Sequence, residues 1–445
     1  MVRGIRTASV LAIATSLAAC ASSAGAAGSA PQMPPPAAKP STQAPATPPA
    51  ATEAGTAAGT ETAGAGAVQR VLARMSLEEK VGQLFMPVLH GTTADSASDG
   101  NQNAFGAATP ARVVAKYHLG GVILFPENIK SVSQVVSLTN GLQKASKGVP
   151  LLIGTDQENG LVSRMSALVT DLPGASVVGA TRNTGLARKA AAATGAELKA
   201  LGVNLDFAPV ADVNLDPRNP VIGKRAFGDD PARVARMVAA SVKGFHDAGV
   251  AATAKHFPGH GDTRIDSHTG LPLIKHTKAQ WATMDAPPFK AAIGADVDAI
   301  MSAHIVMPAL DPSGDPATLS KPILTGLLRD RLGFDGVVST DALNMAGVRK
   351  KYDDGEVAVR AVLAGADLLL MPPDFAKAHG AVMAAVKSGR ISRQRLDQSV
   401  TRLLELRRKR GFLEQAPVAS VAAAADVLRS AEHRRLAATI VRASR

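Results

Sequence analysis

The chain has 445 residues, one cysteine, one tryptophan, two tyrosines and a formal net charge of +12. This length is enough to bury a large core, and a single cysteine excludes a disulfide bond within the chain. A basic balance can indicate nucleic-acid binding, but the sequence contains no recognisable nucleic-acid motif. We therefore expect no nucleic-acid partner.

The first twenty residues have the pattern of an export signal. A charged start with Arg3 and Arg6 precedes a short apolar stretch, and Leu17-Ala18-Ala19-Cys20 ends it with small residues. The stretch is too short to be a permanent membrane-spanning helix. Leu-Ala-Ala-Cys resembles the bacterial lipobox, which implies a signal peptide over residues 1–19 and a lipid anchor on Cys20. The alternative is an ordinary signal peptide with a stray cysteine.

A segment of low complexity follows the signal. From Ala21 to about Gly66 the residues are Ala, Pro, Ser, Thr and Gly with almost no large apolar side chain. Such a composition cannot bury enough surface to offset the loss of chain entropy on folding. We therefore predict that Cys20 and a disordered tether occupy residues 20–67, and that the folded part begins at Val68.

Eight short apolar or β-branched runs alternate with alanine-rich segments of helical period. The clearest helical segments are Thr184–Leu201, Pro231–Ala248 and Lys278–Gly294. This alternation favours a parallel sheet closed as a (β/α)8 TIM-like barrel over residues 68–412, with a C-terminal helical tail over 413–445. The first run also fits the end of a helix. The runs expected to be strands are Val81–Val88, Gly121–Phe125, Leu151–Thr155, Asn204–Val210, Val250–Ala254, Ala299–Ala303, Gly336–Ser339 and Ala366–Met371.

Polar residues follow these strands at their carboxyl ends, the edge at which α/β barrels hold their active sites. Their positions alone therefore predict an active site there. They are Asp156 and Glu158 after the third strand, Asp206 and Asp212 in or after the fourth, Lys255 and His256 after the fifth, His304 after the sixth, and Asp341 after the seventh.

The densest group of such residues is the segment 255–268, Lys-His-Phe-Pro-Gly-His-Gly-Asp-Thr-Arg-Ile-Asp-Ser-His. It breaks from a predicted strand into an irregular loop, and a merely solvated loop does not need three histidines. Asp266 precedes His268 by two residues and can orient its ring for proton transfer. The alternative is a loop histidine in solvent.

The sequence leaves open the role of Asp341 and the possibility of a metal site. Asp341 can act as a nucleophile if Lys255 or Arg225 lowers its pKa, or it can cap a following helix. The histidines and aspartates of 256–268 can in principle bind a metal. Their spacing matches no metal motif, and the Pro-Gly before His260 prevents a helical pair of ligands. We assign no metal and no cofactor.

Five segments together resemble glycoside hydrolase family 3, and within it the bacterial β-N-acetylglucosaminidases. They occur in family order and cover about residues 68–412. The long lysine–histidine motif is the most specific of them. The segments are Asp156-Gln157-Glu158, Gly223-Lys224-Arg225-Ala226-Phe227-Gly228, Lys255-His256-Phe257-Pro258-Gly259-His260-Gly261-Asp262-Thr263, Asp266-Ser267-His268 and Thr340-Asp341-Ala342-Leu343-Asn344-Met345.

The resemblance implies a retaining exo-β-N-acetylglucosaminidase. Asp341 would form a covalent glycosyl-enzyme, and His268, oriented by Asp266, would protonate the leaving oxygen and then activate water. This departs from the usual pair of carboxylates. The residues that the resemblance assigns to sugar binding are Asp156, Arg164, Arg225, Lys255 and His256. Alternatives are a family 3 β-glucosidase or xylosidase, a metal-dependent hydrolase, and a non-catalytic sugar-binding lipoprotein.

The sequence departs from the family pattern at two points, and it also predicts where the protein is located. The usual Gln-Glu-Gly-Gly is Gln157-Glu158-Asn159-Gly160 here, and asparagine tolerates left-handed geometry well. Many relatives continue into a second domain, and the segment Ala431–Ala437 resembles the helix that leads into that domain. Family glucosidases that take their catalytic acid from the second domain are therefore disfavoured. We expect a monomer at the outer face of a bacterial membrane that acts on muropeptides containing N-acetylglucosamine.

The C-terminal part of the chain carries much of the positive charge. In an exported protein such charge can attract anionic lipid or wall polymer. A solvated, arginine-rich helix face is the interpretation that we favour. The residues concerned are Arg407-Arg408-Lys409-Arg410, Arg429, Arg434, Arg435, Arg442 and Arg445.

Overall fold

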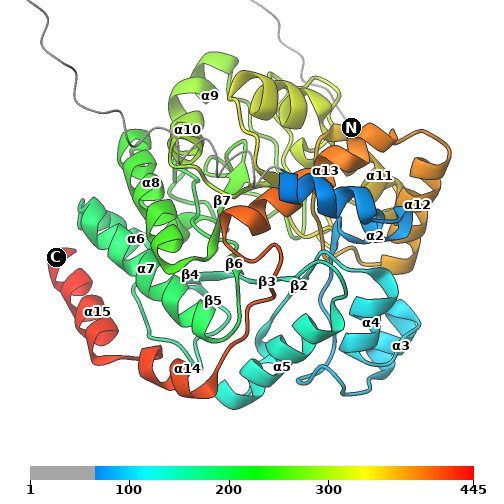
Figure 1. Ribbon diagram of the computed structural model, residues 1–445. Coiled ribbons are helices and arrows are strands. Elements are labelled where there is room, and N and C mark those ends of the chain that lie inside the picture. The colour runs from blue at the N-terminus through cyan, green and yellow to red at the C-terminus, as the bar shows by residue number, and fades with distance from the viewer. Residues whose placement is uncertain (1–65) are drawn as a thin grey trace, which may run out of the picture. The chain divides into compact units, whose positions relative to one another are not determined.

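The computed structural model describes residues 66–445 (Figure 1). The predicted signal peptide, the lipid-anchor Cys20 and almost all of the tether lie outside the described residues. A helix over residues 66–74 spans the boundary expected at Val68, and α2 (Leu77–Gly82) follows it. Ser76 and Glu79 form a capping box that fixes where α2 begins. No helix in this part of the chain is both long and apolar enough to cross a membrane.

All eight expected strands are present, and their neighbours run parallel. Six form one sheet, and the other two, β1 (Phe85–Met86) and β10 (Leu369–Leu370), pair with each other. Single bridges between Val88 and Ile123 and between Ser339 and Leu368 connect that pair to the two edges of the sheet. The chain is thus an α/β domain with a parallel, half-barrel sheet. In spatial order the six strands are β2 (Gly121–Ile123), β3 (Leu152–Thr155), β6 (Leu205–Asp206), β7 (Ala251–Phe257), β8 (Ala299–Ser302) and β9 (Val337–Ser339).

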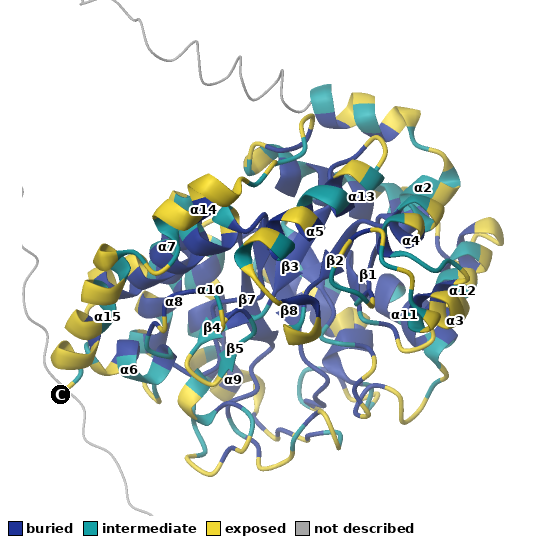
Figure 2. Cartoon of the chain, turned by 90° about the horizontal axis from the view of Figure 1, so that it is seen from below, coloured by how far each residue is buried: buried dark blue, intermediate teal, exposed yellow. Residues whose placement is uncertain are grey.

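Helices alternate with the strands and turn their apolar sides inward, so that buried and exposed residues alternate along them (Figure 2). The tail contains α14 (Val421–Val427) and α15 (Ala431–Ala443). The helices of the domain are α3 (Asp99–Phe105), α4 (Pro110–Tyr117), α5 (Val132–Ala145), α6 (Ala175–Ala180), α7 (Thr184–Ala200), α8 (Pro231–Ala248), α9 (Lys278–Met284), α10 (Ala286–Gly294), a π-helical segment Pro322–Arg331, α11 (Asp354–Ala364), α12 (Phe375–Lys387) and α13 (Arg393–Lys409).

Three predicted boundaries were wrong. The segment 278–294 is two helices rather than one, because Asp285 ends α9 and the prolines after it begin α10. Residues 81 and 82 end α2, so the first strand is shorter than expected. Strand β7 continues to Phe257, which places Lys255 and His256 inside the strand rather than after it.

The inner side of the strands forms a core of its own. Every one of the eight strand segments contributes to it, and Leu403, Leu406 and Phe412 from α13 and its C-terminal end pack against it. Burying such a side chain stabilises the fold by about 1.5–3 kcal/mol. The strand-side members are Met86, Ile123, Leu152, Leu205, Phe207, Ala251, Ala299, Met301, Val337, Leu368 and Leu370.

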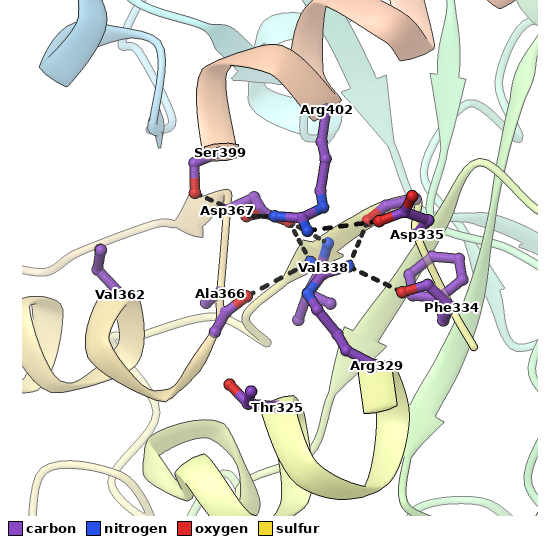
Figure 3. A network of polar contacts seen from close by, with 12 residues as sticks. Thr325, Arg329, Phe334, Asp335, Val338, Val362, Ala366, Asp367, Ser399 and Arg402 are labelled. Carbon is purple, nitrogen blue, oxygen red and sulfur yellow. Dashed lines mark hydrogen bonds and ion pairs between the residues drawn. The ribbon is translucent and has the colours of Figure 1, made fainter. Parts of the chain in front are cut away.

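The amino ends of the strands are closed by buried charged groups. Asp367, just before β10, is fully buried and pairs with Arg329 at 2.5 Å, while Arg402 and the Ser399 hydroxyl contact its other oxygen (Figure 3). Arg395 contacts that oxygen as well. These contacts join α13 and the π-helical segment to the sheet.

Arg407 is the second buried charge at this end of the strands. It is 0% exposed and donates to the carbonyls of Pro150 and Gly120 at 2.6 and 2.7 Å. Burial lowers the pKa of Arg407 to about 9. The expectation that 407–410 forms a solvated face is therefore wrong for Arg407.

Candidate active site

A cavity of about 320 Å³ lies at the carboxyl ends of the strands and brings together seven of the eight predicted site residues. Asp266 is the exception, because it does not line the cavity and instead contacts His268, which does. The seven lining residues are Asp156, Arg164, Arg225, Lys255, His256, His268 and Asp341. The structure thus brings these residues together at one cavity, while three other polar residues predicted at strand ends, Asp206, Asp212 and His304, do not line it.

The floor of the cavity is a four-charge network. Lys255 is almost wholly buried on β7, and its Nζ lies 2.7 Å from both Asp156 Oδ1 and Glu158 Oε1. Arg225, in the 3-10 turn Gly223–Arg225, binds Glu158 through two hydrogen bonds of 2.7 and 2.8 Å. Burial would raise the pKa of Glu158, but Lys255 and Arg225 outweigh it and lower the pKa to about 2. The carboxylates therefore hold both cations in fixed positions.

A β-hairpin that the sequence analysis missed carries part of this floor. Strands β4 (Gln157–Asn159) and β5 (Val162–Ser163) are antiparallel and follow β3 directly. Asn159, the last residue of β4, and Gly160, the first residue of the turn, have φ of 67° and 62°, so both are left-handed. The tolerance expected of Asn159 is confirmed, and the Asn-Gly pair was itself the missed signal for a hairpin.

Asp212 organises the next part of the site. Its Oδ2 lies 2.6 Å from His256 Nδ1, and its Oδ1 accepts from the backbone N–H groups of His256 and His260 at 3.2 and 2.7 Å. The other ring nitrogen of His256 is 3.4 Å from Arg225 Nη2, on the side of the cavity. The carboxylate of Asp212, which does not line the cavity, thus orients the ring of His256.

His260 anchors the loop that carries the proposed acid. Its ring is buried, and Nε2 lies 3.0 Å from the hydroxyl of Ser267, the residue before His268. Burial lowers the pKa of His260 to about 4, so this imidazole is neutral near pH 7. Sequence reasoning counted His260 only as a possible metal ligand and missed this structural role.

Asp341 emerges from β9 at the cavity wall. Its N–H donates to Ser302 O at 3.2 Å, and its Oδ1 accepts from the Ala342 N–H at 2.7 Å. Burial pushes the pKa of Asp341 up, but His256, His304 and the Ala342 N–H hold it below the ordinary value. The cations expected to do this were Lys255 and Arg225; the imidazoles contribute more than Lys255.

The structure overturns the alternative role proposed for Asp341. The residues after it form turns, and the next helix, α11, begins only at Asp354 with Asp353 as its N-cap. Asp341 therefore does not cap a helix, and its carboxylate faces the cavity.

His268 and Asp266 form a pair at the rim. Asp266 Oδ1 lies 2.7 Å from His268 Nδ1 and also accepts from the His268 N–H at 2.8 Å. These contacts lower the pKa of Asp266 against the opposing effect of burial. His268 is largely exposed, as the loop-histidine alternative requires, but it is also paired and lines the cavity. With Nδ1 occupied, proton transfer falls to Nε2.

The three imidazoles of the 255–268 segment have three different partners, namely Asp212, Ser267 and Asp266. Across residues 66–445, no group of three or more His, Cys, Asp and Glu side chains is arranged to hold a metal ion.

Comparison with known proteins places this geometry in a family. The model of the glycosyl hydrolase family 3 N-terminal domain matches residues 76–406. The chain belongs to glycoside hydrolase family 3. The resemblance drawn from the five segments is thus confirmed at the level of the family.

Several relatives share much of this family 3 chain. It is 39% identical to Beta-hexosaminidase A of Pseudoalteromonas piscicida, over 75% of this chain and 60% of that protein. It is 33% identical to a Beta-N-acetylglucosaminidase/beta-glucosidase of Cellulomonas fimi, over 83% of this chain and 64% of that protein. A solved family 3 β-N-acetylglucosaminidase from Paenibacillus superposes with a TM-score of 0.75 and 42% identity, covering 83% and 69% of the two chains. The chain thus spans less than two thirds of the first two relatives.

Proposed function

We propose that this family 3 chain is a retaining exo-β-N-acetylglucosaminidase. One observation carries the proposal: an ionised Asp341 on a strand end and a carboxylate-oriented imidazole, His268, line the same cavity. A nucleophile needs the first, and a residue that alternates between acid and base needs the second. The names of the relatives support the choice of sugar.

In the proposed reaction, Asp341 attacks the anomeric carbon while His268 Nε2 gives its proton to the leaving oxygen. The glycosyl–Asp341 bond forms as the glycosidic bond breaks. His268 then removes a proton from water, which attacks the anomeric carbon and releases Asp341. Asp266 keeps the ring in one orientation and stabilises its charged form through both steps.

The charged floor would bind the sugar itself. Asp156 accepts from hydroxyl groups, and Arg164, Arg225, Lys255 and His256 donate to hydroxyl oxygens and to the N-acetyl carbonyl. Because Lys255 and Arg225 are held by their carboxylates, they offer preorganised donors rather than mobile charges.

The proposal also covers the closure of the barrel, the oligomeric state, the location in the cell and the substrate. We propose that the two bridges beside the β1–β10 pair close a (β/α)8 barrel and that the enzyme acts as a monomer. We also propose that it is a lipoprotein anchored through Cys20 to the outer face of a bacterial membrane. A mouth formed by loops suits chain ends, so muropeptides with a terminal β-linked N-acetylglucosamine are the proposed substrates.

The reaction is tested by hydrolysis of aryl β-N-acetylglucosaminide beside aryl β-glucoside and β-xyloside, with the anomer of the first product followed by NMR. We expect the acetamido sugar to be preferred and the β-anomer to form first. Formation of the α-anomer would overturn the retaining mechanism. A β-glucosidase is the second candidate, because the Cellulomonas fimi relative carries both names; it is favoured if the glucoside reacts faster.

Substrate and location need separate tests. Release of N-acetylglucosamine from purified muropeptides supports the proposed substrate, and its absence in an enzyme active on aryl glycosides contradicts the substrate alone. Membrane fractionation of cells that make the wild type or Cys20→Ala tests the anchor. If both proteins are equally absent from the membrane, the lipoprotein proposal is wrong.

A further inference from the structure

The C-terminal tail packs on the side of the domain that carries Arg164. Helix α14 lies against α5 and α7, and α15 lies against α6 and α7 (Figure 1). Between these two helices, the guanidinium of Arg429 donates to three backbone carbonyls of one loop. The distances are 3.0 Å to Ser166 O, 2.7 Å to Ala167 O and 2.9 Å to Val169 O. Arg429 lies at the surface, as a solvated basic face requires, but its guanidinium is bound to this loop.

Glu197, a buried carboxylate on α7, binds the same loop and the same tail. It accepts from the N–H and the hydroxyl of Thr170 at 2.6 Å each. On the tail side it accepts from the Arg429 N–H at 2.9 Å and pairs with His433 Nδ1 at 2.7 Å. Loop 166–170 is thus held at several points by groups that lie far from it in the sequence.

This loop follows directly on Arg164, whose side chain is held differently from that of Arg225. Arg225 is locked in a two-bond ion pair with Glu158. Arg164 Nε has no hydrogen-bond partner among the described residues, and its guanidinium lies 5.1 Å from the ring centre of Phe125. The position of Arg164 in the cavity therefore depends on where its backbone is held.

We propose that Arg429 is a positioning residue for sugar binding, acting through loop 166–170 on Arg164. The inference rests on the proposed function, since the ligand is the sugar in the cavity. Upstream, the Arg164 N–H is bound to Asp156 O at 3.2 Å. Downstream, the Met165 N–H donates to Gln157 Oε1 at 3.0 Å, and the tail adds a second restraint from Ser166 onward. Without it, Arg164 loses preorganisation, and the loss falls on binding rather than on the chemical step.

The test uses the full chain with Arg429→Met, and Arg442→Met as the matched control. Arg442 is exposed on α15, and within the described part of the chain its side chain hydrogen-bonds only to Thr439 of its own helix. We expect Arg429→Met to raise both KM for aryl β-N-acetylglucosaminide and the Kd for N-acetylglucosamine by about three- to tenfold, as expected for a lost hydrogen-bonded restraint. We expect kcat to stay unchanged, and Arg442→Met to match the wild type.

A double-mutant cycle separates positioning from a general structural role. In an Arg164→Ala background, Arg429→Met should raise KM no further. An undiminished effect there, an unchanged KM in the single variant, or a loss confined to kcat overturns the inference. If Arg429→Met does not fold, Arg429→Lys replaces it, since a lysine keeps the charge but cannot satisfy three carbonyls in the same geometry. A wild type that neither binds nor cleaves the sugar contradicts the proposed function instead.

Discussion

Both ends of the parallel strands bury charge, but only the carboxyl end builds a cavity around it. At the amino end, Asp367 is enclosed by three arginines and a serine, and Arg407 is bound to carbonyls. At the carboxyl end, Lys255, Arg225 and Asp341 are also restrained, yet their polar atoms line a space of about 320 Å³. Burial of charge therefore marks structure as often as function, and an adjoining cavity distinguishes the two.

The largest effect should come from Asp341→Asn, which tests whether the carboxyl end is the reactive one. The amide keeps the shape but removes the nucleophile, so we expect kcat to fall by at least about a thousandfold with little change in Tm. Steady-state kinetics and a thermal melt measure both quantities. A fluorinated mechanism-based sugar should label Asp341 in the wild type, and labelling of another residue would contradict the assignment.

The next effect concerns the exposed rim of the same cavity. His268→Ala should slow glycosylation by about 10²–10⁴-fold on poor leaving groups and much less on activated aryl groups, which need little protonation. Asp266→Ala should act in the same direction and more weakly, because it only frees the ring. Rate constants across a series of leaving-group pKa values decide the matter. Equal losses on all leaving groups would exclude His268 as the acid.

At the amino end, the corresponding change should affect stability alone. Asp367→Asn leaves three arginines without their shared charge, so we expect a loss of about 3 kcal/mol in the free energy of unfolding. Activity per folded molecule should stay at the wild-type level, because Asp367 does not line the cavity. Urea unfolding and kinetics on the same preparation test this. A change in KM or kcat would contradict the prediction that the amino end of the strands contributes to stability alone.

The last effect, which is confined to acidic solution, is a pH dependence of stability that belongs to the cavity floor. The pKa of Glu158 falls from 4.5 to about 2 on folding. Its contribution is therefore complete above pH 4.5 and is lost as the pH falls toward 2, by roughly 3 kcal/mol at most. Urea unfolding between pH 2.5 and pH 7 should show this slope, and Glu158→Gln should flatten it. An equally steep slope in the variant would assign it to other groups.

The sequence predicted the strands and the reacting residues better than the groups that hold them. Strand positions follow from short apolar runs, Asp341 and Lys255 stand out as polar residues at the ends of those runs, and His268 stands out in the polar segment 255–268. Glu197 does not, since one glutamate on a helix has no local signature, and for Asp212 the sequence indicated the strand-end position but not the groups that it binds. Their partners lie at least 27 positions away in the chain, so only the folded chain reveals them.

Arg407 shows the limit most clearly. Four consecutive basic residues on a helix are typical of a solvated face, yet the first of them is buried against backbone carbonyls that precede two strands. The number of charges alone does not distinguish a solvated arginine from a buried one. The period of α13 places Leu403, Leu406 and Arg407 on one side, and that periodicity was the available signal.

The floor of the cavity contains two cations, Lys255 and Arg225, and two anions, Asp156 and Glu158, in direct contact. Their charges cancel over a few ångströms, so the excess of +12 on the whole chain does not extend into the floor as a net field. A neutral sugar thus meets strong local dipoles but no long-range pull. Dissolved salt, which screens interactions across about 10 Å at 0.1 M, should leave its affinity almost unchanged.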